Sequence, residues 1–290
     1  MKVKLGCRGS ELSLAMAELV TKKLEQLDCT VEIVPIKSDG DIHEHKVIAD
    51  IGGKGVFCKR IEDELFNGTI DIAVHSTKDL PTIMPKELIL AGVLKRNDPR
   101  DCVVGKLHPG AVVGTGSPRR LEQLTLIDES LVVKHIRGNV PTRIRKVENG
   151  EYDAVVLARS GIEILGLQDH ITHTFGFDKM LPAVGQGVIA IQTRTMSPYT
   201  ALVRQINHLD TFYCVLAERT ALKFVDGDCH SAIGILAQTT GDCITLQAIN
   251  YNNMKDCTVT GKILDYKKIC LLYTSPSPRD LSTSRMPSSA

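Results

Sequence analysis

Apolar residues in the first 95 positions recur at two spacings, which predict strands and helices in turn. Short apolar runs predict buried strands at 2–6, 31–37, 71–76 and 88–94. After Ser10 the spacing becomes helical, and one buried face is expected. That face consists of Leu12, Met16, Leu19, Val20, Leu24 and Leu27. A second helix is indicated by Phe57, Ile61, Leu65 and Phe66, and Asn67-Gly68 ends it.

The same alternation begins again near Asp101. Strands are predicted at 102–104, 111–115, 131–136 and 153–158. One helix starts at Ser117-Pro118, and another covers about 141–149. Two such α/β units favour mainly parallel sheets with helices on both faces. The segment PAVGQGVIAIQ (182–192) is interpreted as a connection that returns the chain to the first unit.

From about residue 199 the pattern changes. Two helical segments (199–223) precede the polar loop VDGDCHSAIG, and three strand-like runs follow with no helix between them. A small antiparallel α+β domain is the natural interpretation. The tail, 273–290, is rich in Ser, Pro and Arg and has no apolar period. It is predicted to be disordered, it looks like translated cloning or adaptor sequence, and the fold argument omits it.

The composition is that of an ordinary globular chain. It has 290 residues, 43% hydrophobic and 24% charged, enough for two or three domains of roughly 100 residues. With 35 Lys+Arg against 34 Asp+Glu, no nucleic-acid partner is expected. No apolar run reaches the roughly 18 residues of a membrane span. The N-terminus enters a strand without a signal or transit pattern, so a cytoplasmic protein is expected, by default a monomer.

Nine cysteines occur, an odd number with no C-x-x-C pair. Neither a metal site nor a disulfide framework is supported, and a reducing compartment fits better. Most are expected to be small core residues. Cys229 differs, because it lies in the polar loop beside His230, where a thiol can act as a nucleophile or attach a prosthetic group.

Cations collect in loops at the ends of the predicted strands. They are Arg8, Lys54, Lys59, Lys78, Arg119, Arg120, Arg137, Arg143 and Arg159. In α/β sheets, ligands bind beyond the carboxyl ends of strands, and helix N-termini there attract anions. A nearly neutral chain with this arrangement is predicted to hold a polyanion in a cleft. The alternative is a set of surface cations paired with neighbouring acids.

One carboxylate, Asp79, follows strand 71–76 and stands among these cations. Nearby positive charge should keep it ionised. It could then stabilise a cationic intermediate or exchange protons with a ligand N–H. The alternative is an ordinary turn residue ahead of Leu80-Pro81. His75, at the end of the same strand, is expected to be a structural hydrogen-bonding residue.

Eight segments in consistent order, from about residue 3 to 265, resemble the porphobilinogen deaminase (hydroxymethylbilane synthase) family. They are RGSELSLAMA, GGKGVFCK, DIAVHSTKDLP, LKRNDPRD, VGTGSPRR, IRGNVPTR, LPAVGQG and GDCHSAIG. The resemblance implies two α/β domains like the lobes of type II periplasmic binding proteins, residues 1–95 with 186–206 and residues 96–185. A small α+β domain (207–272) carries the cofactor.

The resemblance also implies chemistry. Four porphobilinogens are condensed into hydroxymethylbilane with release of ammonia, on a dipyrromethane cofactor joined by a thioether to Cys229. Asp79 matches the catalytic aspartate, which holds pyrrole N–H groups and stabilises azafulvene-type cations. Positions matching those that bind acetate and propionate groups are Arg8, Ser10, Lys78, Ser117, Arg119, Arg120, Arg137 and Arg143. Lys54, Lys59 and Arg159 are further substrate or loop candidates, and no metal is expected.

Several positions depart from the family pattern. In the cofactor loop Asp228 replaces a glycine and Ala232 a proline. Ile164 stands where a cation is common, with Arg159 as a possible spatial substitute, and Gln192 stands where an acid is usual. No closing helix is found for the third domain. A native chain is therefore expected to continue beyond about residue 272 and to be more stable than this one.

Two other functions fit parts of the pattern. A two-lobed anion receptor without catalysis would share the fold, because function belongs to the site. A cysteine hydrolase would use Cys229 and a histidine, but no partner stands at a meaningful spacing. For the deaminase, hinge motion between the first two lobes is expected as the product lengthens.

Overall fold

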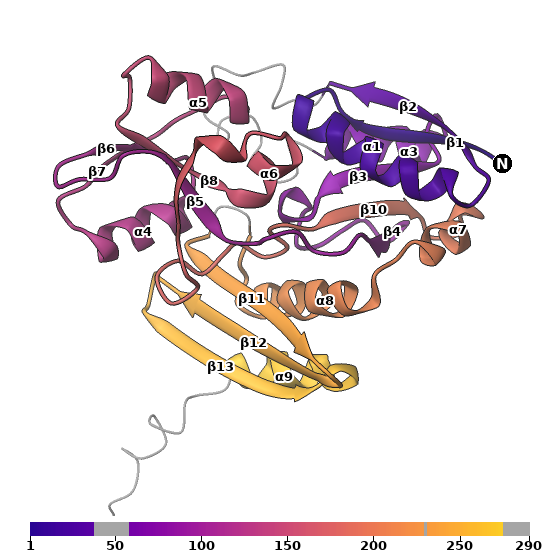
Figure 1. Ribbon diagram of the computed structural model, residues 1–290. Coiled ribbons are helices and arrows are strands. Elements are labelled where there is room, and N and C mark those ends of the chain that lie inside the picture. The colour runs from indigo at the N-terminus through magenta and orange to yellow at the C-terminus, as the bar shows by residue number, and fades with distance from the viewer. Residues whose placement is uncertain (38–57, 229–230, 275–290) are drawn as a thin grey trace, which may run out of the picture.

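The computed structural model describes residues 1–37, 58–228 and 231–274, arranged around three β-sheets (Figure 1). The first sheet has the strand order β2-β1-β3-β10-β4. Its strands are β1 (Lys2–Arg8), β2 (Thr30–Ile36), β3 (Ile72–Ser76), β4 (Leu88–Val93) and β10 (Ile189–Arg194). Apolar residues of α1 (Glu11–Glu25) and α7 (Tyr199–Gln205) pack on one face. Those of α3 (Lys59–Asn67) and α8 (Leu209–Phe224) pack on the other.

The second sheet has the order β7-β6-β8-β5-β9. Its strands are β5 (Asp101–Gly105), β6 (Val112–Gly114), β7 (Val132–Lys134), β8 (Ala154–Ala158) and β9 (Ile171–Thr174). Helix α4 (Pro118–Ile127) covers one face through Leu124. Helices α5 (Val140–Glu148) and α6 (Arg159–Ile164) cover the other through Ile144 and Ile162, and a short 3₁₀ turn, η3 (Gln168–His170), precedes β9.

The third sheet is antiparallel and small. It contains β11 (Ile233–Thr240), β12 (Cys243–Asn250) and β13 (Lys255–Lys262), followed by η4 (Ile263–Asp265) and α9 (Tyr266–Thr274). Its apolar face packs against α8 and α9, as Figure 1 shows. Because α8 also contacts the first sheet through Val215, this helix joins the two units.

Helix boundaries follow the signals in the sequence. Ser10 caps α1 by accepting from the Ser13 N–H at 3.3 Å. Gly68 ends α3 in the left-handed conformation, with φ 71°, which glycine adopts without strain. Helix α4 begins with Ser117-Pro118 as predicted. The predicted fold class, two α/β units and a small α+β unit, is confirmed. The boundaries at 1–95 with 186–206, 96–185 and 207–272 stay predictions.

The first two sheets are mainly parallel, as predicted, with one antiparallel strand in each: β10 runs antiparallel to β3 and β4, and β5 runs antiparallel to β8 and β9. Strands β5 and β10 are the first that the chain forms after passing between sheets, so no crossover helix imposes a parallel direction on them. One prediction was wrong: Leu19, assigned to the buried face of the first helix, is 37% exposed.

Three elements were not predicted: α6, β9 and α9. Helix α9 provides a closing helix where the sequence predicted none, and it includes residues 273 and 274, which were assigned to the disordered tail. The rest of that predicted tail, 275–290, lies outside the described residues. Among the described helices, none has the length and apolar character needed to cross a membrane.

Candidate active site

Two extended segments, 94–100 and 175–188, connect the first and second sheets and hydrogen-bond to each other. The Asn97 N–H donates to Gly187 O at 2.9 Å, and the Leu94 N–H donates to Ile189 O at 3.1 Å. Gly187 has φ +82°, and a Cβ there would lie 2.7 Å from Asn97 O. Only glycine allows this close approach. The two crossings therefore form one paired unit beside the ends of β3 and β5.

A buried carboxylate attaches the third sheet to these crossings. Glu218 of α8 accepts two hydrogen bonds from Arg96, at 2.5 and 3.1 Å. It also accepts from the N–H groups of Gly185, at 2.7 Å, and Ala237, at 2.8 Å. The four bonds satisfy a carboxylate that is 0% exposed. One side chain thus joins α8, both crossings and β11.

Asp79 lies in the 3₁₀ turn η2 (Thr77–Asp79), directly after β3. The N–H and hydroxyl of Thr77 both donate to Val188 O, at 3.0 and 2.9 Å. The Cys58 thiol donates to the backbone oxygen of Asp79 at 3.2 Å. The turn is therefore held by its backbone. No hydrogen bond or ion pair to the Asp79 carboxylate itself is found in the described ranges.

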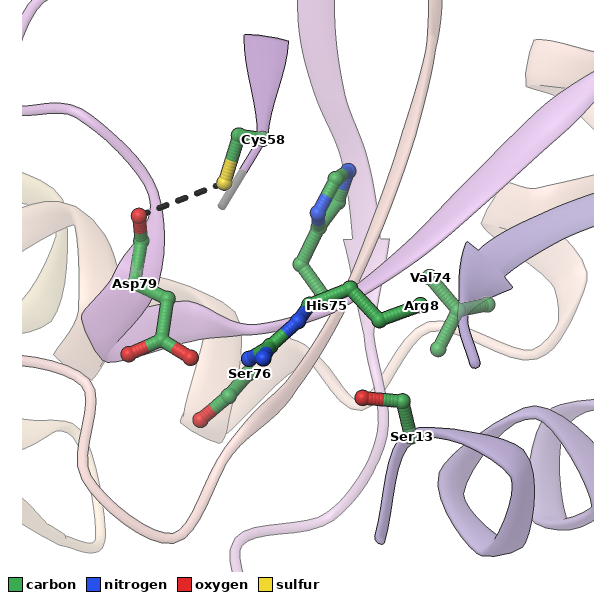
Figure 2. Close-up of a pocket in the computed structure, with 7 residues that line it drawn as sticks. All are labelled: Arg8, Ser13, Cys58, Val74, His75, Ser76 and Asp79. Carbon is green, nitrogen blue, oxygen red and sulfur yellow. Dashed lines mark hydrogen bonds between the residues drawn. The ribbon is translucent and has the colours of Figure 1, made fainter. Parts of the chain in front are cut away.

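The Asp79 side chain faces a small pocket, shown in Figure 2. The pocket is lined by Arg8, Ser13, Cys58, Val74, His75, Ser76 and Asp79. Arg8 extends across it toward the side of Asp79, while Ser13 enters from the start of α1 (Figure 2). A carboxylate and a guanidinium thus face the same space, as the sequence predicted for the ends of β1 and β3.

Further cations gather behind this pocket and repel one another. Burial, and then Arg120, lowers the pKa of Lys78 to about 8, although Asp79 and Asp101 oppose the shift. Burial, and then Arg120 and Arg137, lowers the pKa of Arg143 to about 10. The cluster contains the cations Arg8, Lys78, Arg119, Arg120, Arg137 and Arg143 and the carboxylates Asp79 and Asp101. Without Arg8 and Arg137, the four cations Lys78, Arg119, Arg120 and Arg143 still outnumber Asp79 and Asp101 among the described residues.

Arg119 and Arg120 share one buried carboxylate, Asp101. Arg119 Nη1 lies 2.8 Å from one oxygen, and Arg120 Nη2 lies 2.6 Å from the other. Burial alone would raise the pKa of Asp101, but the two guanidinium groups lower it. Arg119 Nη1 also donates to Leu181 O at 2.7 Å, and Arg120 Nη1 donates to Val156 O at 3.0 Å. Both arginines, predicted only as ligand-binding residues, therefore also hold β5, α4 and β8 together.

This group still leaves capacity for an anion. Two guanidinium groups against one carboxylate leave a net charge of +1. The Arg119 Nε is also buried and has no hydrogen-bond partner within the described part of the chain. An orphaned N–H on a cation is costly unless a ligand occupies it. An anionic group, such as a carboxylate, would match this charge and this donor.

Ser10 and Ser117 act first as helix caps, since their hydroxyls accept from the N–H groups of Ser13 and Arg120. Arg143 Nε donates to Gly138 O at 2.8 Å, which leaves the rest of its guanidinium for other partners. These helix starts lie where the sequence placed them, at the ends of strands.

Two predicted cations do not join the cluster. Arg159 pairs with Glu163 at 2.7 Å and with Asp98 at 3.4 Å, so its charge is balanced. Arg159 was expected to take the place of the cation that is missing at position 164. Ile164 itself packs against the apolar core under α1. Lys59 is exposed at the first residue of α3. The candidates Lys54 and Cys229 lie outside the described residues.

The loop that leads to position 229 starts beside the Asp79 turn. Thr82 Oγ1 donates to Gly227 O at 3.0 Å, and Arg219 Nη2 donates to Pro81 O at 2.6 Å. Asp228, which departs from the family pattern, accepts from the Ser231 hydroxyl at 3.1 Å. Loop and turn are therefore neighbours.

Sequence reasoning missed Asp101 and Gln186. Gln186 donates to Asp101 at 2.9 Å and lies 3.5 Å from Lys78 Nζ. The segment NDPRD contains two acids, and no sequence signal separates half-buried Asp98 from buried Asp101. Only the pairing of β5 with β8 places Asp101 inside.

Comparison with known proteins identifies the family. Residues 3–201 match the family model described as "Porphobilinogen deaminase, dipyromethane cofactor binding domain". The chain belongs to the porphobilinogen deaminase family. It is 39% identical over 251 residues to a porphobilinogen deaminase of Caldicellulosiruptor saccharolyticus, covering 84% of this chain and 87% of that one. It is 38% identical over 284 residues to that of Rickettsia prowazekii, covering 94% of each.

Among solved structures, this chain is similar to a periplasmic substrate-binding protein of an ABC transporter from Coxiella burnetii. The TM-score is 0.44 at 14% identity, over 78% of this chain and 98% of that one. A BvgS VFT2 domain from Bordetella pertussis gives a TM-score of 0.43 at 15% identity, over 71% and 86%. Likenesses this distant do not bear on function.

Proposed function

We propose that this chain is a hydroxymethylbilane synthase, a transferase that condenses four porphobilinogen molecules head-to-tail with release of ammonia in tetrapyrrole biosynthesis. The observation that carries the proposal is that Lys78, Arg119, Arg120 and Arg143 outnumber Asp79 and Asp101 among the described residues around the pocket that Asp79 faces. Each pyrrole unit of the product brings two carboxylates. A site with unmatched positive charge suits a ligand whose negative charge grows.

The residues present fit a dipyrromethane cofactor. Lys78 and Arg143 both have lowered pKa values, because burial and neighbouring cations disfavour their charged forms. Acidic side chains of a bound cofactor would relieve both effects. The buried N–H of Arg119 offers one further donor. We assign these three residues, with Arg8 and Arg120, to holding its carboxylates, and Cys229 to the thioether.

When bound, the cofactor supplies the pyrrole carbon to which new units are joined. The protein's own task is orientation and charge compensation. Asp79 accepts hydrogen bonds from pyrrole N–H groups and stabilises the cation that forms when ammonia leaves porphobilinogen. The surrounding cations bind the substrate carboxylates, so these carboxylates do not compete with Asp79 for the pyrrole N–H groups. Ser10, Ser117 and Arg137 support these contacts at the helix starts and loops.

Intact-protein mass spectrometry tests the attachment. The native chain is expected to carry the mass of one dipyrromethane, and Cys229→Ser is expected to lack it. Cys243→Ser is the matched control, because Cys243 is an exposed free thiol on β12. An unmodified, folded native chain would favour a non-catalytic two-lobed anion receptor. An adduct that survives Cys229→Ser would remove Cys229 from its assigned role.

The proposal includes a cytoplasmic monomer with no nucleic-acid or membrane partner. Free thiols at all eight cysteines of the described ranges support a reducing compartment. The near balance of 35 basic and 34 acidic residues supports a small-molecule partner over nucleic acid. Gel filtration with light scattering checks the monomer, for which a dimer mass would be the contrary result.

A further inference from the structure

A buried polar chain lies behind the Asp79 pocket and connects three elements. His75 of β3, Gln192 of β10 and Glu62 of α3 are only 5%, 0% and 7% exposed. Gln192 Oε1 lies 3.1 Å from His75 Nε2, and Gln192 Nε2 donates to Glu62 Oε1 at 2.8 Å. His75 also lines the pocket together with Arg8 (Figure 2). The cation cluster does not account for this chain.

The donors and acceptors of the chain have one consistent direction. The amide nitrogen of Gln192 faces Glu62 and the amide oxygen faces His75, which is the orientation that an ionised Glu62 requires, because a carboxylate only accepts. Burial, and then Asp63, raises the pKa of Glu62, and the hydrogen bond from Gln192 opposes that shift. His75 Nε2 must then carry a hydrogen. Burial lowers the pKa of His75 to about 4, the hydrogen bond that the ring donates to Gln192 opposes this shift, and Arg8 adds to the lowering. The ring is therefore neutral at physiological pH, and Nδ1 keeps its lone pair.

The charge of His75 matters because of what surrounds it. Arg8 from β1 and Asp79 from the turn after β3 share its pocket, and Glu62 of α3 reaches it through Gln192. A protonated His75 would add a second cation beside Arg8. It would also attract the Asp79 carboxylate, which in the described structure has no ion-pair partner. A neutral ring leaves Asp79 available to a ligand.

We propose that Gln192 is a positioning residue: it holds His75 as the neutral Nε2–H tautomer, so that the pocket wall beside Arg8 and Asp79 presents an accepting nitrogen and no charge. The link to turnover rests on the proposed function, whereas the tautomer does not. Gln192 is an amide that cannot titrate. It transmits the orientation set by Glu62 without carrying a charge of its own.

Nitrogen-15 NMR of histidine-labelled, cofactor-loaded protein tests the tautomer directly, with His75→Asn used to assign the signal. Nε2 is expected to be protonated and Nδ1 unprotonated from pH 5 to pH 8. Glu62→Gln removes the group that orients the amide, so a mixture of tautomers is expected there. An Nδ1–H tautomer in the native protein, or a His75 that titrates near 6.5, would overturn the proposal.

Variants of Gln192 give a kinetic test. Gln192→Glu places a carboxylate opposite Nε2–H, which raises the pKa of His75 toward the neutral range. A new step is expected in the pH profile, with kcat/KM about tenfold lower at pH 6 than at pH 8 relative to the native enzyme. Gln192→Met keeps the volume and adds no charge, so the step is expected to be absent.

A Gln192→Glu profile that superimposes on the native one would also overturn the proposal. If Gln192→Met fails to fold, the NMR comparison of native protein with Glu62→Gln still decides. If the native enzyme shows no turnover, the proposed function fails but the tautomer proposal does not, because NMR determines the tautomer without any activity measurement.

Discussion

Half-buried cations occur in two settings in this molecule: Arg96 is matched by a protein carboxylate, whereas Lys78 and Arg143 are not. At the crossings, Arg96 pairs with Glu218 at 2.5 Å, and backbone N–H groups fill the other positions of that carboxylate. Around Asp79, by contrast, neither Lys78 nor Arg143 forms an ion pair in the described structure, and their pKa values fall to about 8 and about 10, with burial as the first cause and Arg120 as the next.

The difference separates cations that stabilise the fold from cations that are available to a ligand. A matched buried pair fixes the elements that contribute it, and breaking it is costly. Unmatched cations destabilise the folded chain until an anion binds, so a ligand that binds there stabilises the fold by mass action. The chain therefore accepts a local cost around Asp79 that it avoids at the crossings.

The largest effect is expected from removing the Asp79 carboxylate, which faces the pocket. Asp79→Asn keeps the size of the side chain but cannot stabilise a cation. We expect kcat to fall by about 10²–10⁴-fold, the range of a lost acid–base or charge-stabilising group. Steady-state release of ammonia measures it. Because the backbone holds the Asp79 turn, the thermal midpoint and the cofactor adduct should both be retained.

Retained activity in Asp79→Asn would remove Asp79 from its assigned role. Loss of the adduct as well would mean that the variant fails at loading, which single-turnover measurement on pre-loaded protein separates. Asp98→Asn serves as the control, because Asp98 is bound by Arg100 and Arg159 away from the pocket.

The next largest effect is expected from removing Glu218, the carboxylate that pairs with Arg96. Glu218→Ala leaves Arg96 with an uncompensated charge and leaves the N–H groups of Gly185 and Ala237 without their acceptor. We expect a loss of about 3–5 kcal/mol in the free energy of unfolding. Urea denaturation followed by circular dichroism measures it.

Glu32→Ala is the control for Glu218→Ala, since Glu32 forms only an exposed pair with Lys2 and should not change the midpoint. Glu218→Gln should be intermediate, because the amide oxygen still accepts. Equal midpoints for Glu218→Ala and the native chain would show that the third sheet does not depend on this carboxylate.

Lys78 gives a smaller, pH-dependent effect. Its charged form attracts ligand carboxylates, and burial followed by Arg120 lowers its pKa to about 8. KM for porphobilinogen should therefore rise as pH increases through about 8. Lys78→Arg, whose guanidinium stays charged, should remove that rise. A native KM that is flat between pH 7 and pH 9 would contradict the assignment.

The same shift has a consequence for stability without ligand. The folded pKa lies below the ordinary value of 10.5, so between about pH 8 and pH 10.5 the unfolded chain binds more protons. Lys78 should then add stability as pH rises through that window. Thermal scans of Cys229→Ser, which carries no cofactor, provide the measurement, with Cys229→Ser/Lys78→Met as the comparison.

The elements were predictable where local signals are strong. Ser10, Gly68 and Ser117-Pro118 mark helix ends by their own chemistry, and the apolar runs of β3 and β4 identify buried strands. Strand direction was not predictable in this way. The direction of β5 and β10 is set by where the crossings enter each sheet, which depends on contacts between residues far apart in the sequence.

The site was predictable as a set of cations and one aspartate, but not in its division of roles. Arg119 and Arg159 both follow strands and look alike in sequence. The structure gives Arg119 a buried partner and a spare N–H, whereas Arg159 is balanced by Asp98 and Glu163. Whether a charge is matched depends on burial and on distant acids, and sequence spacing contains neither.

The smallest effect is expected at Arg159, and it sharpens the comparison most. Arg159→Ala removes a cation that two carboxylates already balance, so KM should change by less than about twofold. Arg143→Ala, its partner experiment, removes an unmatched cation and should raise KM about tenfold or more, the value of a charged hydrogen bond. Substrate titration at pH 7 compares the two. Similar increases in KM for both variants would mean that protein carboxylates do not decide which cations serve the ligand.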